Sequence, residues 1–230
     1  MTRCIVQSEE PIVLFGGGES GVRAVKRALA ISTIVAAADG GAKSALNYGV
    51  MPAAVIGDLD SVDDATISRL PEASFHRIAE QDSTDFDKAL RSIEAPLVLA
   101  VGFTGARMDH TLAAMNTLVS RADQRCVVLG EKDVVFLSPP QMDIDLPAGE
   151  VFSLFPLGPV RGSSKGLKWP IDGLEFGPNT RVGTSNEVTG PVHLKFDSPN
   201  MLVILPLEHL AEVVSQLLNC SARWPASEMR

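Results

Sequence analysis

Six aspartates follow apolar runs in the sequence, at places where a buried strand would give way to a loop. The segments that hold them read ADGG, GDLDS, QDSTDFDKA and GARMDH, and the residues are Asp39, Asp58, Asp60, Asp82, Asp85 and Asp109. Residues just beyond the carboxyl ends of neighbouring parallel strands converge on one crevice, so these carboxylates are expected to share a cleft. Like charges held close together raise each other's pKa values or recruit a counter-ion. Oxygen ligands favour a hard cation, and the sequence therefore predicts bound Mg²⁺ with water and substrate phosphates among its ligands.

A single aspartate after a strand has a simpler explanation, because Asp often caps the helix that follows. Taken alone, Asp58 fits that role better than the role of a metal ligand. The doublet Asp58-Leu59-Asp60 is different, since it lies between glycine and serine and is echoed by acidic residues after three other strands. This clustering favours a metal site over a set of unrelated helix caps.

Three cations lie near the expected cleft, namely Lys43, Lys88 and Arg107. Lys88 follows Asp85 by three residues, which places the two side chains on one face of a helix. Arg107 stands just before Asp109 in a glycine-containing loop. Arg as a bidentate donor and Lys as a point charge can both bind phosphate oxygens, although weak surface ion pairs explain either residue equally well. The four histidines show no partner pattern and are expected to be structural.

The run Gly16–Gly21 reads GGGESG and matches GxGxxG between a predicted strand and a predicted helix. With Asp39 near the distance of a ribose-binding acid, the match suggests a nicotinamide dinucleotide-dependent oxidoreductase. Hydride transfer does not require five further carboxylates at the strand ends, however. The glycines could also form a plain tight turn with no role in binding. A P-loop is absent because GK[ST] does not occur in the sequence. A non-catalytic nucleotide-binding protein is a third possibility.

The elements that must position these residues alternate in type along the first 137 residues. Apolar runs predict strands, and apolar residues at helical spacing predict the helices between them. The strands are expected at 12–15, 33–38, 53–56, 75–79, 97–101 and 126–129, and the helices near 22–30, 42–48, 84–92 and 108–120. Such alternation predicts an α/β domain with a parallel sheet covered by helices.

The pattern changes to period two from about residue 143, with Gly and Pro between the segments. It predicts strands at 143–146, 151–155, 174–176, 192–196 and 201–205, and a closing helix over 207–218. We therefore expect an α/β domain over residues 1–140 followed by a smaller all-β domain over 141–230, with a boundary at Pro139–Pro140.

Length and composition restrict the function. The chain has 230 residues, enough for one domain or two. Lys and Arg number 20 against 28 Asp and Glu, a formal net charge of −8, so nucleic-acid binding is not expected. No uncharged apolar stretch reaches the roughly 18 residues of a membrane span, and the N-terminal residues lack a signal-peptide pattern. The three cysteines are widely separated, which fits a reduced, cytoplasmic protein.

Six segments between residues 36 and 190 together resemble the thiamin pyrophosphokinase family. They are ADGGA, IGDLDS, QDSTDFDKAL, GARMDH with Asn116 downstream, GLKW and TSNE, in the order of the family. The resemblance implies an N-terminal α/β domain followed by a C-terminal β-sandwich. It also implies transfer of the pyrophosphoryl group of ATP to thiamin, which gives thiamin diphosphate and AMP and requires Mg²⁺.

The resemblance further implies roles for individual residues. The acidic site residues would be Asp39, Asp58, Asp60, Asp85 and Asp109, with Asp58, Asp60 and Asp85 as metal ligands. The residues around the nucleotide would be Gln81, Asp82, Thr84, Lys88, Arg107 and Asn116. The thiamin side would hold Trp169, Thr184, Ser185 and Asn186, at the interface of a homodimer. Thiamin is cationic and flat, which suits an acidic cleft and an aromatic such as Trp169, although Trp169 could equally be a core aromatic.

Overall fold

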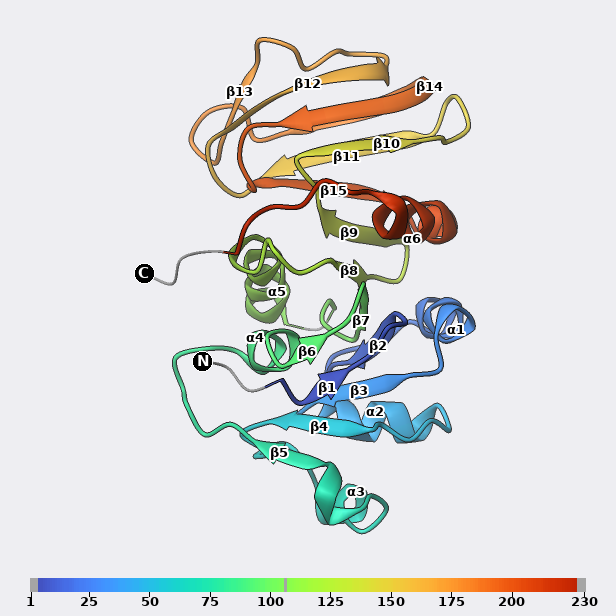
Figure 1. Ribbon diagram of the computed structural model, residues 1–230, viewed down its shortest axis with the longest axis vertical. Helices are drawn as coiled ribbons and strands as arrows, with labels where there is room; N and C mark the ends of the chain where they lie inside the picture. Colours follow the sequence, from blue (N-terminus) through green and yellow to red (C-terminus); the bar gives the residue numbers. More distant parts are fainter. Residues whose placement is uncertain (1–3, 106, 227–230) are drawn as a thin grey trace. The chain divides into compact units, whose positions relative to one another are not determined.

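Residues 4–105 and 107–226 are described here in a computed structural model (Figure 1). Ala106, which belongs to the GARMDH segment, lies outside the described residues. Contacts within the chain divide it into two units. Unit 1 comprises the described residues up to Thr117 together with Cys126–Glu131, and unit 2 comprises Leu118–Arg125 and the described residues from Lys132 onward.

Unit 1 contains a parallel sheet with the strand order β5-β4-β3-β2-β7-β8. A separate short pair joins β1 to β6, also in parallel. The strands are β1 (Val6–Gln7), β2 (Ile12–Phe15), β3 (Val35–Ala38), β4 (Ala54–Gly57), β5 (Phe75–Arg77), β6 (Ile93–Glu94), β7 (Val98–Val101) and β8 (Cys126–Leu129). The helical segments are α1 (Val22–Ile31), α2 (Gly41–Asn47), α3 (Asp64–Ile67), η1 (Glu72–Ser74), α4 (Asp85–Leu90) and α5 (Met108–Ser120), of which α5 ends in unit 2.

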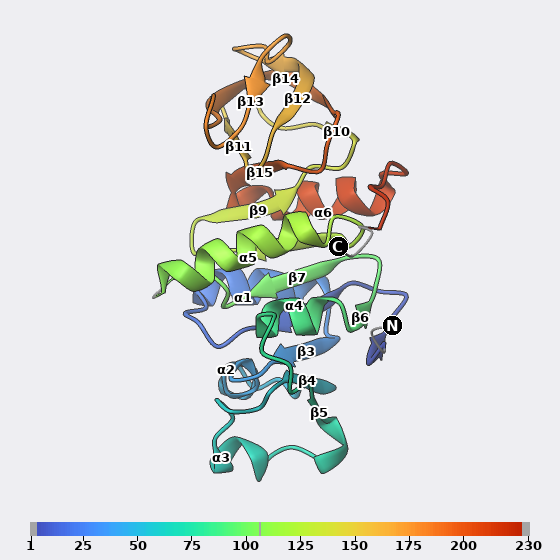
Figure 2. The same ribbon diagram turned by 90° about the vertical axis from the view of Figure 1, so that its left-hand side faces the viewer.

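The strands of this sheet are buried on both faces because helices cover them. Every residue of β2, β3, β4, β7 and β8 is buried. Right-handed crossovers place α1 and α2 on one face and α4 on the other, as the view in Figure 2 also shows. The apolar runs of the sequence thus predict these strands correctly, and the mixed α/β class is confirmed.

The order of the strands reverses between β2 and β7, since β3 lies on one side of β2 and β7 on the other. The loops after these two strands approach each other closely. A Cβ on Gly16 would lie 2.5 Å from the carbonyl oxygen of Gly102, and Gly102 has a φ of +78°. Only glycine fits this approach. A crevice at such a reversal is where open α/β sheets bind their ligands.

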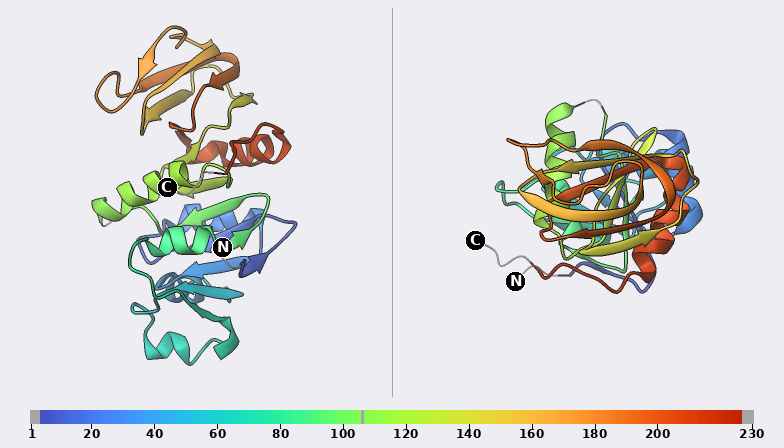
Figure 3. Two further views of the ribbon diagram at one scale, coloured as in Figure 1. Left: turned by 60° about the vertical axis from the view of Figure 1, so that its left-hand side comes forward. Right: turned by 90° about the horizontal axis from the view of Figure 1, so that it is seen from above.

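Unit 2 is built mainly of antiparallel strands around the long strand β14 (Figure 3). The first part of β14 pairs with β11, β11 pairs with β15, and β15 pairs with β9. The last part of β14 pairs with β10 and β12. The elements are β9 (Asp133–Leu137), β10 (Gln141–Ile144), β11 (Val151–Pro156), β12 (Val160–Leu167), β13 (Glu175–Phe176), β14 (Thr184–Phe196), β15 (Met201–Pro206), η2 (Leu207–His209) and α6 (Leu210–Asn219). None of the helices in the described residues has the length and hydropathy of a membrane span.

Two strands of unit 2, β9 and β12, are not among the strands predicted from the sequence. β12 reads VRGSSKGL, with apolar residues only at its ends, and its pairing with β14 shifts between Lys165 and Leu167. Gly166 stands at that shift with a φ of +74°, and a Cβ there would lie 2.1 Å from the Pro191 carbonyl oxygen. β9 follows β8 after only three residues and pairs with β15, a partner far along the chain. β12 is therefore formed by long-range pairing, whereas β9 (DVVFL) has an apolar run of its own that the sequence analysis leaves unassigned.

Candidate active site

A cavity of about 610 Å³ lies in unit 1, where the loops after several strands of the sheet meet. The glycine loops after β2 and β7 line it, as does the first half of α4. Of the residues predicted for the nucleotide and metal site, those that line it are Asp39, Asp58, Gln81, Thr84, Asp85, Lys88 and Arg107. The convergence that the sequence predicts at the strand ends is thus present for residues from four loops.

Asp39 is the most deeply buried of these carboxylates, with 5% of its surface exposed. Burial raises its pKa, and the charges of Asp85 and Asp60 raise it further, against a hydrogen bond with Ser61 that lowers it. Its Oδ1 atom is buried and has no hydrogen-bond partner among the described residues. Its φ of +45° is unusual for a residue other than glycine. One oxygen of the Asp39 carboxylate therefore lacks a hydrogen-bond partner among the described residues.

Replacing Asp39 with Asn should stabilise the ligand-free fold and abolish activity. A raised pKa means that the folded state disfavours the carboxylate, which costs stability at neutral pH. Asn removes the charge and tolerates the left-handed backbone well. We expect the thermal midpoint in EDTA at pH 7 to rise by about 2–4 °C, equivalent to about 1 kcal/mol. The gain should fade as the pH falls through the raised pKa of Asp39 in the folded protein, and it should be gone below the unfolded pKa of about 4. An equal gain at pH 7 and pH 3 would contradict this electrostatic account.

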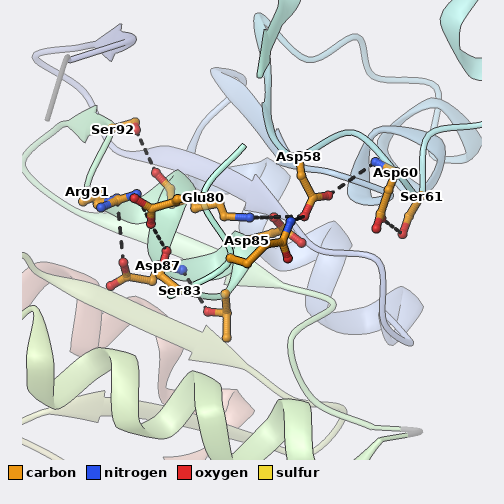
Figure 4. Close-up of polar contacts among 12 residues, drawn as sticks. Asp58, Asp60, Ser61, Glu80, Ser83, Asp85, Asp87, Arg91 and Ser92 are labelled. Carbon is orange, nitrogen blue, oxygen red and sulfur yellow. Dashed lines mark hydrogen bonds and ion pairs between the residues drawn. The ribbon is translucent and has the colours of Figure 1, made fainter. Parts of the chain in front are cut away.

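The doublet lies close to Asp39. One carboxylate oxygen from each of Asp39, Asp58 and Asp60 can be chosen so that all lie within 4.8 Å of one another. Leu59, between the two aspartates, has a φ of +67° and so forms a sharp turn. In this turn the backbone N of Asp60 donates to Asp58 Oδ1 over 3.4 Å, and Ser61 Oγ donates to Asp60 Oδ1 over 2.9 Å (Figure 4). The turn brings both carboxylates of the doublet to the acidic cluster.

Lys88 provides the positive charge in this acidic region. It is 1% exposed, and its Nζ lies 3.0 Å from Asp85 Oδ1 and 3.3 Å from Asp58 Oδ2. Desolvation lowers the pKa of Lys88, but its bonds to Asp85 and Asp58 outweigh that effect and raise the pKa above its ordinary value. Desolvation raises the pKa of Asp58, whereas bonds from the Asp60 backbone, Lys88 and Gln81 bring it below its ordinary value. The ammonium group of Lys88 and the carboxylate of Asp58 thus remain charged at neutral pH.

Arg107 and Asp109 form an exposed bidentate ion pair. The Nε–Oδ1 distance is 3.1 Å and the Nη2–Oδ2 distance is 2.5 Å. The hydrogen bonds from Arg107 hold the pKa of Asp109 at about 2. Arg107 lines the cavity, but Asp109 does not. Asp109 therefore contacts the site through the guanidinium group rather than as a member of the acidic cluster.

The remaining predicted residues of unit 1 have different surroundings. Gln81 Nε2 donates to Asp58 Oδ2 over 3.3 Å, and Thr84 Oγ1 caps α4 by accepting from the backbone N of Asp87. Asp82 and Asn116 are exposed and are not among the residues that line the cavity. The structure brings Gln81 and Thr84 to the cavity but not these two residues.

Several cavity residues have no predicted role in the sequence analysis. Ser61 could have been found, because it directly follows the doublet. Phe86 and Phe103 have ring centroids 4.2 Å apart, and no sequence signal joins them across 17 positions. His110 also lines the cavity, so the interpretation of the histidines as purely structural is not supported for this residue. The further side chains are those of Ser83, Thr104, Ala113 and Ala114.

The predicted thiamin-side residues lie in unit 2. Trp169 is 53% exposed, so the alternative that it is a core aromatic is wrong. Asn186 is buried and holds the backbone of Trp169, because its Oδ1 accepts from Trp169 N over 3.1 Å and its Nδ2 donates to Trp169 O over 2.7 Å. Thr184 and Ser185 begin β14, where Ser185 pairs with Ser153. The exposed indole is therefore fixed at its backbone by the TSN segment.

The glycine run does not form a phosphate cradle with its first amides. The backbone N of Gly16 donates to Val101 O over 2.8 Å, and that of Gly18 donates to Gly102 O over 2.9 Å. These donors are occupied by the neighbouring strand β7 and the residue after it. A dinucleotide site of the predicted kind needs such amides to face the pyrophosphate, so the local geometry argues against the oxidoreductase.

A parallel α/β sheet with an acidic crevice at its strand reversal, followed by a β-rich unit, fits an enzyme that acts on a nucleotide phosphate. Two family models match the chain: "Thiamin pyrophosphokinase, catalytic domain" over residues 25–129 and "Thiamin pyrophosphokinase, vitamin B1 binding domain" over residues 141–201. The chain belongs to the thiamin pyrophosphokinase family, whose members are enzymes. These matches lend no support to the oxidoreductase alternative.

Individual relatives agree with the family models. Thiamin pyrophosphokinase 1 of Caenorhabditis elegans is 26% identical over 176 residues, which cover 69% of this chain and 71% of that protein. The fold is similar to that of thiamin pyrophosphokinase from Geobacillus thermodenitrificans, with a TM-score of 0.69 and 21% identity over 85% of this chain and 96% of that one. It is also similar to the Candida albicans enzyme, with a TM-score of 0.74 and 16% identity over 87% and 92% of the two chains.

Proposed function

We propose that this chain transfers the pyrophosphoryl group of ATP to the hydroxyl group of thiamin and so forms thiamin diphosphate and AMP. The observation that carries the proposal is the match of a catalytic and a vitamin B1-binding family model, in that order, on one chain. The acidic cavity of unit 1 supports it, because a triphosphate can enter an acidic site only with cations that neutralise both. Catalysis then consists of positioning and electrostatic stabilisation.

The acidic cluster, of which Asp39 and Asp58 line the cavity and Asp60 does not, fits a magnesium ion. The unpartnered Oδ1 of buried Asp39 and its proximity to Asp58 and Asp60 form a set of hard oxygen donors. We propose that Asp58, Asp60 and Asp85 hold Mg²⁺, with Asp39 beside them. When bound, the metal would neutralise charge on the triphosphate.

On the nucleotide side, the cationic and polar groups have separate tasks. Lys88 is fixed between two carboxylates and is placed to donate its remaining proton to a phosphate oxygen. Arg107 is exposed and forms an ion pair with Asp109. When ATP binds, its guanidinium group would release Asp109 and bind phosphate oxygens, which can also accept two hydrogen bonds. Gln81 and Thr84 would also contact the nucleotide. We propose that Asp82 and Asn116, which do not line the cavity, contribute to the nucleotide side from outside it.

Unit 2 would bind thiamin. Trp169 presents its exposed indole for stacking on the flat, cationic vitamin, and Thr184, Ser185 and Asn186 lie beside it. We propose that this site is at the interface of a homodimer. Apolar side chains exposed on the same unit support an interface, namely Val151, Phe155 and Val182.

We further propose that the predicted division at about residue 140 separates two domains and that the two groups of strands joined by β14 are the layers of a β-sandwich. Because β9 pairs with β15, the sandwich would also include β9, and the division would then lie near residue 132. The alternating burial along β10 and β14 supports the sandwich. The free cysteines Cys4, Cys126 and Cys220 are consistent with a cytoplasmic location.

Incubation with ATP, Mg²⁺ and thiamin tests the function directly. We expect AMP and thiamin diphosphate in equal amounts by chromatography, and no product after chelation of Mg²⁺. Formation of ADP would identify a γ-phosphoryl kinase instead, and tight binding of NAD without AMP formation would favour the oxidoreductase.

Trp169→Ala should weaken the use of thiamin without weakening the use of ATP. Removing an aromatic side chain on which a nucleic-acid base stacks costs about 1–3 kcal/mol of binding free energy, and we expect a similar cost for the flat ring of thiamin. We therefore expect the KM for thiamin to rise about tenfold, while the KM for ATP changes less than twofold. Ser185→Ala should shift the same constant in the same direction. Equal effects on both substrates would contradict a thiamin-side role.

A further inference from the structure

The segment from Ile78 to Thr84, named here the Glu80 loop, carries cavity-lining residues but has few backbone contacts. Its backbone is tied at its two ends: Ile78 N donates to Gly57 O over 2.7 Å, and Thr84 O accepts from Lys88 N over 2.9 Å. Between these ends, residues 79–83 make no backbone–backbone hydrogen bond within the described parts of the chain. Side chains must therefore hold the middle of the loop.

Arg91, the residue that ends α4, provides such a contact. Its Nη2 donates to Glu80 Oε1 over 2.6 Å, and its Nε lies 3.7 Å from Asp87 Oδ2. The Ser83 hydroxyl donates to the same Glu80 oxygen, so one carboxylate closes the turn of the loop and joins it to the helix (Figure 4). The side chain of Arg91 is 16% exposed and that of Glu80 is 39% exposed, so the Arg91 end of this contact is the part shielded from solvent.

The turn that Glu80 closes contains Gln81. The Gln81 side chain reaches Asp58 Oδ2, the oxygen that also accepts from Lys88. Helix α4 thus fixes the acidic cluster through Lys88 and fixes the loop beside it through Arg91. A helix that holds both groups sets the distance between the loop and the cluster.

We propose that Arg91 is a positioning residue that, through its hydrogen bond to Glu80, keeps the Glu80 loop and its Gln81 side chain at the nucleotide side of the cavity. Arg91 does not line the cavity and acts through the loop. The inference rests on the proposed function in one respect, since the ligand that the loop meets is taken to be the triphosphate.

The test is the steady-state kinetics of Arg91 variants of the full chain. For Arg91→Met we expect the KM for ATP at saturating Mg²⁺ to rise about tenfold, as for supporting partners at other polar sites. The KM for thiamin should change less than twofold. Arg91→Lys should recover part of the loss, because a single ammonium group can reach Glu80 but cannot make both contacts. Arg161→Met is the matched control, because Arg161 forms an exposed ion pair with Glu175 in unit 2.

A double-mutant cycle separates positioning from general damage. Glu80→Gln and Arg91→Met should each raise the KM for ATP. The double variant should be no worse than the poorer single variant, because both substitutions remove the same contact between Arg91 and Glu80. Additive effects, or equal rises in the KM for both substrates, would overturn the proposal. Calorimetric titration of each variant with ATP and Mg²⁺, in the absence of thiamin, measures the affinity for ATP directly. It allows the same double-mutant cycle to be built without turnover. A wild-type chain that binds ATP but forms no thiamin diphosphate would refute the proposed function and leave the test of Arg91 intact.

Discussion

Asp58→Asn and Asp60→Asn should each lower turnover by roughly a thousandfold or more and leave the fold in place. Both residues belong to the acidic cluster at the strand ends, where ligand atoms of three aspartates lie within 4.8 Å. Loss of a metal ligand removes several kcal/mol of charge stabilisation from the transition state, and each 1.36 kcal/mol is a factor of ten in rate. The measurement is AMP formation at saturating ATP, thiamin and Mg²⁺.

The fold should survive these changes for a local reason. Asn is close to Asp in size, and Lys88 keeps Asp85 as a partner when Asp58 loses its charge. Circular dichroism should therefore match that of the wild type. Asp145→Asn serves as the control, because Asp145 is an exposed aspartate of unit 2. Wild-type activity in both doublet variants would contradict the metal site.

Lys88→Met should be the most damaging single change for stability among the cavity residues. Lys88 is almost completely buried and pairs with Asp58 and Asp85, whose side chains are 14% and 34% exposed. Removing one partner from a buried ion pair leaves uncompensated charge and costs about 3–5 kcal/mol. We expect about 3 kcal/mol by urea unfolding, at the lower end because water reaches Asp85. Turnover should also fall by at least a hundredfold, since the cation that we propose to lie beside the phosphates is lost.

The pH dependence of this loss has a defined sign. The pKa of Asp58 is below its ordinary value in the folded wild type, so its ion pair stabilises the fold above the unfolded pKa of about 4. That stabilisation disappears as the pH falls through the lowered folded pKa. The difference between wild type and Lys88→Met should therefore be largest near pH 7 and shrink in acid.

Two further measurements test the cause. Mg²⁺ should restore part of the stability of Lys88→Met, because a cation can replace the missing positive charge. For comparison, Lys43→Met should change the unfolding free energy by no more than about 1 kcal/mol, since the Lys43–Asp63 pair is exposed. A loss for Lys88→Met that is constant from pH 3 to pH 7 and insensitive to Mg²⁺ would indicate a packing defect instead.

The strands of unit 1 could be read from the sequence because their hydrophobic signal is local. β2 and β8 are continuous apolar runs of four residues, and both begin and end as predicted. α5 likewise agrees with the expected helix over 108–120. A parallel strand that is buried on both faces requires such a run. The position of each of these strands can therefore be read directly from the apolar pattern. β12, which owes its existence to pairing with β14, offers no comparable signal.

The sequence by itself determined which residue types stand after the strands and which pairs are neighbours along the chain. The doublet Asp58-Leu59-Asp60 and the spacing of Asp85 and Lys88 predict an acidic site with a cation beside it, because strand ends and helical turns have fixed geometry.

Only the tertiary structure decided how these groups are distributed. It buries Lys88 between Asp85 and a carboxylate 30 positions away, leaves an oxygen of Asp39 unsatisfied, and turns Asp109 toward Arg107 rather than into the cluster. The bond from Arg91 to Glu80 and the contact of Phe86 with Phe103 are likewise invisible in the sequence. The physical reason is that the energy of a charge depends on its burial and on its partners in space, and the packing of helix α4 against the strands sets both.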